Sequence, residues 1–492
     1  MCTSWTKMPR GVYTAFAGLM LAQSAVQAQP AVPPSAPPLA GPTAGSSPQA
    51  VPRPLAIGSP GNALVPVPSG GGRDLSVQEA VERALAQGPE LRRLQALEFA
   101  AKEGAAEARL GRLPRLETMA SYTRVGGFPE GRIVAGGFTQ TLSVPHDRVA
   151  LSASISYPVT QVWLRVLPAI EAADAGAEAA QARVRVEESQ LRLRVQQSYY
   201  HTLRARGVLA VMEAAVARSE AEVQEVRAAI GAGVLASPDG ASATARLAAA
   251  RQDVVVAKTA LEVEEVALGT LLGDEPGTRY RLSAPLHYRP LANPLPQLGV
   301  LLEYAFERRS ESVALRASLA AEQAQARLEE AGRYPSLAVY AGADYARPNR
   351  YVIPPGDGLD PSWELGVSLS YSPNDTLTAQ RRLGGARAQV QARQAELAAL
   401  RQALRLEVST ARAQVLAAAE RITAAQATSE AALAAYDQRL AGLQVGTEVL
   451  ADVFVAADTL NRARLSELDA VVEAILAKAV LAYTVASPLD EL

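Results

Sequence analysis

Few side chains in this 492-residue sequence have types and spacings that could perform chemistry. The three histidines, His146, His201 and His287, are far apart and lack metal-ligand spacing. The single cysteine, Cys2, lies in the N-terminal leader, so the rest of the chain offers no thiolate. No phosphate-binding glycine motif precedes a helical pattern. We therefore expect no catalytic residues, no metal and no cofactor.

Two acidic pairs, Glu187-Glu188 and Glu264-Glu265, could in principle serve as acid and base. Both pairs lie inside strongly helical patterns, where adjacent glutamates are usually solvated surface charges. The net charge of −2, with 20% charged and 49% hydrophobic residues, gives no field that would favour nucleic acid. The sequence predicts a protein that is not an enzyme. Because its charge indicates no partner, its partners must be inferred from the predicted architecture.

The dominant element is a proline-free stretch of 62 residues, Ala169 to Ile230, built mostly from strong helix formers. As one helix it would be roughly 90 Å long, so it must lie along other helices. The Gln-Leu-Arg-Leu-Arg-Val run inside it alternates like a strand, but its neighbours on both sides favour helix. Two glycines and Pro238 then break the pattern, and a second helix is predicted from about Ala241 to Leu272, which turns the chain back.

The same order of predicted helices and strands occurs twice in the sequence. Ala80 to Leu116 aligns without gaps on Leu301 to Leu337, and the turn glycines and aspartates repeat at a shift of 213 residues, Gly233 with Gly446 and Asp239 with Asp452. We expect a first repeat over 74–297, with helices 74–112, strands 114–124 and 148–157, helices 165–272 and an irregular connection 273–297. The second repeat should cover 298–487, with helices 298–333, strands 335–345 and 362–371, and helices 376–484.

The N-terminus carries the features of an exported protein. Residues 1–28 combine Lys7 and Arg10, a short apolar run and a small-residue cleavage site, which predicts a signal peptide; a membrane anchor is the alternative. Residues 29–73 are rich in Pro, Ala and Gly, and this composition predicts a flexible linker.

The four predicted strands alternate between apolar and small polar residues, as transmembrane β-strands of about 9–11 residues do. The apolar face would include Leu151, Ile155, Tyr157, Trp363, Leu365, Leu369 and Tyr371. Trp363, Tyr157 and Tyr371 at the strand ends suit an interfacial aromatic girdle. A soluble half-buried sheet is the alternative. Four strands cannot close a barrel, so the membrane interpretation requires several chains, and three would supply twelve strands.

The helix lengths support one architecture. The helix that enters the strands, 89–112, and the helix that returns, 241–272, together match the long helix in length. In the second repeat, 311–333 and 449–483 balance a long helix from about Arg382 to Ala441. The predicted fold is mostly α, with a long antiparallel α-helical barrel and a small transmembrane β part.

These features together resemble the TolC-type outer-membrane efflux family over 74–483. The residues that carry the resemblance are the helix–Pro–strand junctions around Pro114 and Pro335, Tyr371-Ser-Pro-Asn-Asp375, and the turns Gly231-Ala-Gly-Val-Leu235 and Gln444-Val-Gly-Thr-Glu448. The resemblance implies a homotrimer with a 12-stranded outer-membrane barrel and a 12-helix barrel in the periplasm. Its tip would dock a periplasmic adaptor protein and an inner-membrane transporter. The turn residues assigned to adaptor docking are Gly231, Gly233, Val234, Leu235, Gly446 and Thr447.

The resemblance also implies a gate at the helical turns, where such proteins commonly have acidic rings. Asp452 would be the ring residue, Asp239 its counterpart in the first repeat, and Glu448 a further negative charge. Val455 stands where a second acidic residue would be, and Glu448 where a basic latch would be. Both aspartates also follow a turn and precede a helix, so an ordinary helix-capping role is the alternative.

The expected function is a passive outer-membrane exit duct of a tripartite efflux or type I secretion system. The runner-up is a periplasmic coiled-coil scaffold without a pore. The strands with aromatic ends favour the duct, because a scaffold has no use for a lipid-facing surface.

Overall fold

The structure is a computed structural model, and it describes residues 72–126, 131–142, 146–275, 277–284, 286–289, 294–352 and 358–487. The chain divides into two units, Met1–Leu55 and Ala56–Leu492, and every described residue belongs to the second. The predicted signal peptide and nearly all of the predicted linker lie outside the described residues.

Each half of the chain carries helices, then strands, then helices. The elements of the first half are β1 (Arg73–Leu75), α1 (Val77–Gln87), α2 (Pro89–Leu110), β2 (Arg115–Arg124), β3 (Gly131–Ala135), β4 (Phe138–Leu142), β5 (Asp147–Tyr157), α3 (Val159–Gln161), a π-helical turn η1 (Val162–Val166), α4 (Leu167–Gly231), α5 (Ser237–Leu272) and β6 (Tyr280–Leu282). Those of the second half are α6 (Leu298–Arg308), α7 (Ser310–Ala331), β7 (Ser336–Arg347), β8 (Asp360–Ser370), α8 (Pro373–Gln444) and α9 (Leu450–Val485).

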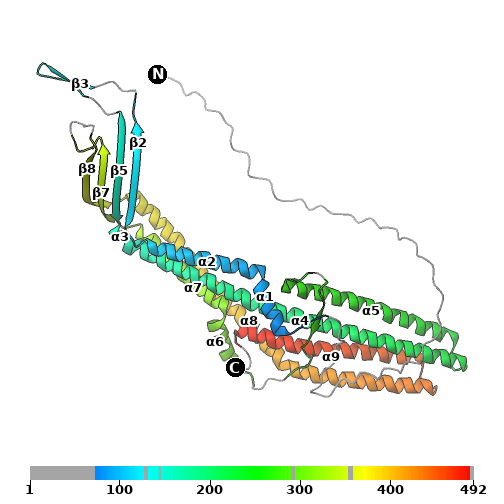
Figure 1. The fold of residues 1–492 in the computed structure, drawn as a ribbon. Helices are drawn as coiled ribbons and strands as arrows, with labels where there is room; N and C mark the ends of the chain where they lie inside the picture. The colour runs from blue at the N-terminus through cyan, green and yellow to red at the C-terminus, as the bar shows by residue number, and fades with distance from the viewer. Residues whose placement is uncertain are drawn as a thin grey trace, which may run out of the picture. The chain divides into compact units, whose positions relative to one another are not determined.

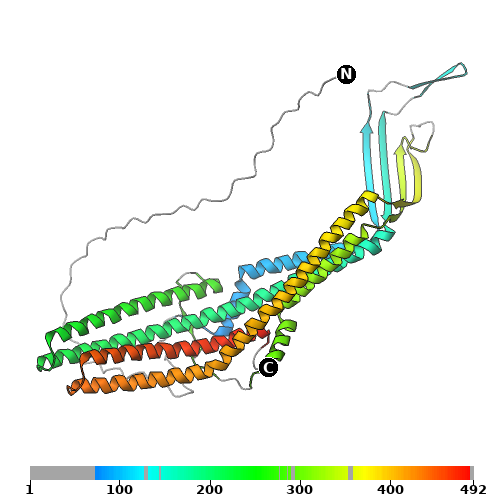
Figure 2. The ribbon, with the colours of Figure 1, turned by 180° about the vertical axis from the view of Figure 1, so that it is seen from behind.

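Two long helices organise the helical part, α4 with 65 residues and α8 with 72. α4 packs against α2 near the strands and against α5 near the turns, while α8 packs against α7 and then α9 (Figures 1 and 2). α4 also contacts α7 and α9, which joins the two repeats side by side. Among the described residues, no helix has both the length and the apolar composition that crossing a bilayer requires.

The second long helix starts earlier than the sequence analysis placed it, at Pro373 instead of about Arg382. Ser372 caps it, because its hydroxyl accepts a hydrogen bond from the backbone N–H of Asp375 at 3.3 Å. Pro373 occupies the first helical position, where a missing N–H costs no hydrogen bond. Local capping therefore extends the helix up to the last strand.

The four long strands form one antiparallel sheet in the order β2-β5-β7-β8, which leaves β2 and β8 as its edges. The register places predicted apolar residues beside one another, such as Leu116 next to Ile155, Ile155 next to Ala341, and Ala341 next to Leu365. On the opposite face Gly366 leaves room for the Tyr340 ring, since a Cβ there would lie 2.6 Å from ring atoms. The predicted two-residue alternation is present across the sheet.

Two strand pairs were not anticipated from the sequence. β1 and β6 pair in parallel, so a short strand precedes α1 and the segment predicted to be irregular, 273–297, contains a second one. Ser76 caps α1, because its hydroxyl accepts a hydrogen bond from the backbone N–H of Glu79. β3 and β4 form a separate ribbon whose turn uses Gly136 and Gly137, both at positive φ.

The β1–β6 pair closes the core where the shorter helices meet. The Tyr199 hydroxyl on α4 is fully buried; it donates to the Leu75 carbonyl at 2.9 Å and accepts from the Ala284 N–H at 3.1 Å. Leu203, Leu268 and other apolar residues surround it. α4 thereby fixes both the N-terminal strand and the connection between repeats.

A buried polar contact joins α4 to α8 closer to the turns. Glu222 is 4% exposed, and its carboxylate accepts a hydrogen bond from the Tyr436 hydroxyl at 2.9 Å. Arg246 on α5 lies 3.9 Å from the other carboxylate oxygen, and it is bonded to Asp458 of α9. Burial raises the pKa of the Glu222 carboxyl above its ordinary value of 4.5, although Tyr436, Arg246 and Arg218 act in the opposite direction.

This contact predicts a pH-dependent stability. A carboxyl whose pKa is higher in the folded than in the unfolded state binds more protons when folded, so its contribution to the unfolding free energy falls as the pH rises above about 4.5. Glu222→Gln should therefore raise the thermal unfolding midpoint at neutral pH and leave it unchanged at pH 4. Circular dichroism in detergent would measure this shift. Glu220→Gln, an exposed change on the same helix, is the control and should have little effect at either pH.

Candidate functional site

The two helical turns at the end away from the strands have the same backbone design. In the first turn, Val234 N–H bonds to the Ala229 carbonyl at 2.9 Å, and Gly233 has φ of 77°. In the second, Thr447 N–H bonds to the Gly442 carbonyl at 2.9 Å, and Gly446 has φ of 75°. Both are glycine-terminated helix ends, in which the left-handed residue lets the chain reverse.

An apolar cluster holds the two turns together. Val223 and Val226 of α4, Ala243 of α5 and Leu450 of α9 are buried against one another, and Leu235 packs on them. Leu235 is therefore half-buried, whereas Gly231, Gly233, Val234, Gly446 and Thr447 are exposed. Val234 is 61% exposed, so the turns present apolar side chains to the outside.

Asp452 and Glu448 lie close together, and a cation that the sequence analysis missed lies between them. The Arg439 guanidinium on α8 is 3.3 Å from the Glu448 carboxylate and 3.4 Å from that of Asp452. Gly442 makes room for this arrangement, since a Cβ there would lie 2.6 Å from the Glu448 side chain. Within one chain the two carboxylates therefore share one positive charge. The groups are partly exposed, so the pairs are individually weak.

Asp239 behaves differently from Asp452. Its carboxylate accepts a hydrogen bond from the Ala236 N–H at 3.0 Å, which satisfies a donor at the start of α5. In the part of the chain that the structure describes, Asp452 makes no such bond to the equivalent Val449. The capping explanation therefore accounts for Asp239 but not for Asp452.

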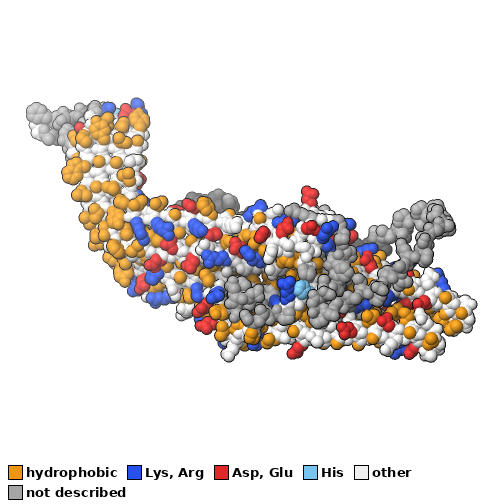
Figure 3. All heavy atoms as spheres, turned by 60° about the horizontal axis from the view of Figure 1, so that its bottom comes forward, with side chains coloured by type: hydrophobic (Ala, Val, Ile, Leu, Met, Phe, Trp, Pro, Cys, Tyr) orange, Lys and Arg blue, Asp and Glu red, His pale blue; other side chains and the backbone are white. Residues whose placement is uncertain are grey.

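The second site is the apolar face of the four-stranded sheet. Its side chains are exposed although they are large, for example Trp363 at 79%, Leu369 at 71% and Leu151 at 56%. Figure 3 shows hydrophobic side chains covering this part of the molecule with few charges among them. The remaining predicted lipid-facing residues lie on the same face by register, namely Ile155, Tyr157 and Leu365. Tyr371 is 58% exposed directly after β8.

The opposite face is polar and is bonded within itself. It carries Ser152 and Ser154 of β5, Asp344 of β7 and Glu364 of β8. Arg350 bridges the last two, at 3.1 Å from Asp344 and 2.8 Å from Glu364. A sheet with one exposed apolar face and one hydrated face fits a wall between lipid and water.

The comparisons with known proteins agree on the fold. Among solved structures, the outer-membrane channel OprN is similar with a TM-score of 0.71 and 21% identity, over 87% of this chain and 97% of that chain. VceC from Vibrio cholerae gives 0.70 and 19%, over 84% and 96%. CusC gives 0.72 and 18%, over 84% and 92%. A comparison with curated protein sequences finds no match.

A family model settles the relationship that these structures indicate. The model described as "Outer membrane efflux protein" matches residues 80–274 and 301–482, which is well over half of the chain. The two matched segments each contain one pair of long strands and one long helix. The chain belongs to the outer membrane efflux protein family, as an outer-membrane protein with a long periplasmic extension.

Proposed function

We propose that three copies of this chain form the exit duct of a tripartite efflux or type I secretion system. The duct conducts substrate passively, and an inner-membrane transporter supplies the energy through a periplasmic adaptor protein. The exposed turn residues Gly231, Gly233, Val234, Gly446 and Thr447 are the proposed docking surface for the adaptor. Family membership supports the efflux role, and the exposed turns support the docking role.

The observation that carries the proposal is an exposed apolar sheet with two free edges. Among the strands that the structure describes, β2 and β8 each have a partner on one side only. Lipid offers no hydrogen bonds, so a bilayer tolerates strands only in a closed barrel. Three copies joined from β8 to β2 would give twelve strands and no free edge. A periplasmic scaffold would instead leave the apolar face in water.

The proposed gate is the turn region with Asp452 and Glu448. In a threefold assembly each charge is present three times around one axis, and carboxylates close together attract divalent cations. Arg439 reduces this field, because it shares its charge with both carboxylates. Asp239 is the weaker gate candidate, since its carboxylate is used as a helix cap.

The first test of the assembly is its mass. The detergent-solubilised protein should have three times the mass of the mature chain by multi-angle light scattering, because open strand edges are not stable in lipid. A folded monomer that remains embedded in membranes would contradict the proposal.

The strands give a second test. Leu151→Arg or Leu369→Arg should each destabilise the membrane-inserted protein by about 2–4 kcal/mol if the residue lies near the bilayer midplane. Ser154→Arg, on the polar face of the same strand as Leu151, should be tolerated better. Folding into vesicles, followed by urea titration, measures both. Equal effects on the two faces would exclude a lipid-facing sheet.

The gate residues give a third test, in which charge and capping predict different results. Asp452→Ala and Asp452→Asn should both weaken the block of single-channel current by divalent cations, since both remove a carboxylate from the pore mouth. Arg439→Gln should strengthen the block, because it leaves Glu448 and Asp452 without their shared cation. Planar bilayers at low salt are the suitable system, as screening is least there.

Asp239 supplies the matched control for this test. Asp239→Asn keeps a capping oxygen and should change the block less than Asp452→Asn does. If Asp452→Asn left block and selectivity unchanged while Asp452→Ala altered them, Asp452 would be a cap and the gate assignment would fail.

A further inference from the structure

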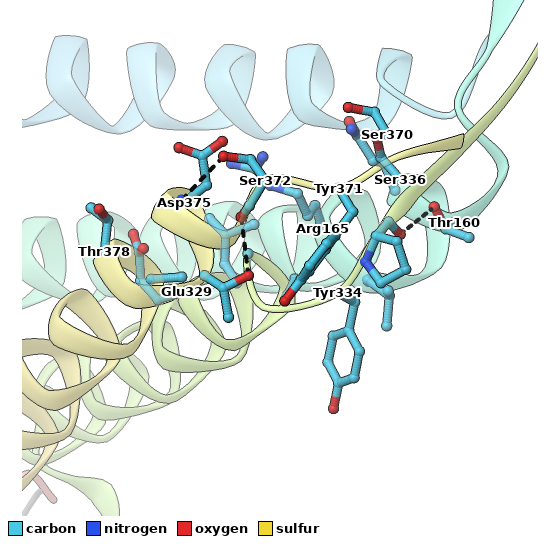
Figure 4. A pocket seen from close by; sticks show the side chains of 18 of the residues that line it. Thr160, Arg165, Glu329, Tyr334, Ser336, Ser370, Tyr371, Ser372, Asp375 and Thr378 are labelled. Atoms are coloured by element: carbon cyan, nitrogen blue, oxygen red, sulfur yellow. Dashed lines mark hydrogen bonds between the residues drawn. The ribbon is translucent and has the colours of Figure 1, made fainter. Parts of the chain in front are cut away.

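A polar cavity lies where the sheet meets the helices (Figure 4). Its volume is about 250 Å³. Four chain segments line it: α3 with η1, the end of α7 with the start of β7, the end of β8, and the first turns of α8. The lining residues that matter for its chemistry are Thr160, Arg165, Glu329, Tyr371, Asp375 and Arg382.

The charges around this cavity are balanced but do not neutralise one another. Within the described ranges, the Arg165 and Arg382 guanidiniums have no carboxylate within 4.0 Å and make no hydrogen bond. The Asp375 carboxylate likewise has no such partner in the described chain, and within the same ranges the Glu329 carboxylate accepts only from the Gln325 side-chain amide at 3.3 Å. Two cations and two anions thus remain available around one polar space. This pattern suits a ligand that carries both a negative and a positive group.

The framework around these groups is already bonded. The Thr160 hydroxyl accepts from the Leu337 N–H at 2.8 Å, and the Ser372 hydroxyl accepts from the Asp375 N–H at 3.3 Å. In the view of Figure 4, Arg165 lies between Thr160 on one side and Ser372 with Asp375 on the other. These bonds tie α3 to the start of β7 and fix the start of α8 without any ligand.

The cavity lies at the end of β8, where Ser370 of the polar face and Tyr371 both line it. Tyr371 lines it and continues the row of Leu365, Val367 and Leu369 along β8. A molecule whose polar group entered the cavity would have its apolar part against this row.

We propose that this cavity binds the headgroup of a zwitterionic phospholipid of the phosphoethanolamine type. Arg165 and Arg382 would bind the phosphate, for which guanidinium geometry is well suited. Asp375 and Glu329 would accept hydrogen bonds from the primary ammonium group, and the acyl chains would lie along β8. The inference rests on the proposed function, because it requires the strands to be in lipid.

Native mass spectrometry of the full mature trimer, titrated with defined lipids, tests this site. Phosphatidylethanolamine should bind with up to one molecule per chain. Phosphatidylcholine has the same net charge but no ammonium N–H, so it should bind about tenfold more weakly. The Arg165→Gln/Arg382→Gln double variant should lose about tenfold or more in phosphatidylethanolamine binding. Arg387→Gln is the matched control, an exposed arginine on the same helix outside the cavity, and should bind like the unchanged protein.

Three results would overturn the inference. These are equal binding of phosphatidylcholine, tighter binding of anionic phosphatidylglycerol, or an equal loss in Arg387→Gln and the double variant. Soluble phosphoethanolamine at the same concentration should not compete; full competition would indicate a site for a free phosphate ester instead. Flotation with vesicles distinguishes a failure of the headgroup site from a failure of the proposed function. A chain that does not float overturns both the proposed function and the headgroup site. A chain that floats without lipid preference overturns only the headgroup site.

Discussion

The free backbone groups along β2 and β8 are the constraint on which the rest of the structure depends. Each edge strand presents a row of N–H and C=O groups that no other strand in the described ranges satisfies. In water such an edge invites aggregation, and in a bilayer it is not tolerated. With its apolar face exposed as well, the sheet is complete only when other copies join it. The proposed trimer is therefore a requirement of the strands before it is a property of the helices.

The long helices must also have their apolar surface covered, and here the chain itself supplies the cover. α4 and α8 are each longer than any other helix in the described part of the chain, so two shorter helices laid end to end cover each of them. The break between those shorter helices would expose apolar surface. The β1–β6 pair and the buried Tyr199 hydroxyl fill that position in the first repeat, where they satisfy polar backbone groups and exclude water. The connection between the repeats is thus part of the core.

The sequence predicted those features that local pattern determines. A proline-free run of helix formers requires a helix, and a strict two-residue alternation requires a strand with two different faces. The β1 and β6 strands, at three residues each, are too short for periodicity to detect. The Glu222–Tyr436 contact joins residues 214 positions apart, and it depends on how two helix faces meet. The sequence around Glu222 does not indicate Tyr436 as its partner, and the sequence around Tyr436 does not indicate Glu222.

In the gate region, too, the sequence did not predict which side chains contact one another, although these residues are closer in the chain. The sequence pointed to Glu448 and Asp452, which lie at the turn. Arg439 lies before the turn, on the preceding helix, and contacts both carboxylates. Gly442 leaves the space that the Glu448 side chain occupies in this arrangement. The family resemblance implies a different pattern, in which position 448 is basic and positions 452 and 455 are acidic. That pattern has a net charge of −1 per chain. Here Glu448, Asp452 and Arg439 together also give −1, while Val455 is neutral. In the proposed trimer, Arg439 would therefore supply near the common axis the positive charge that the resemblance assigns to position 448.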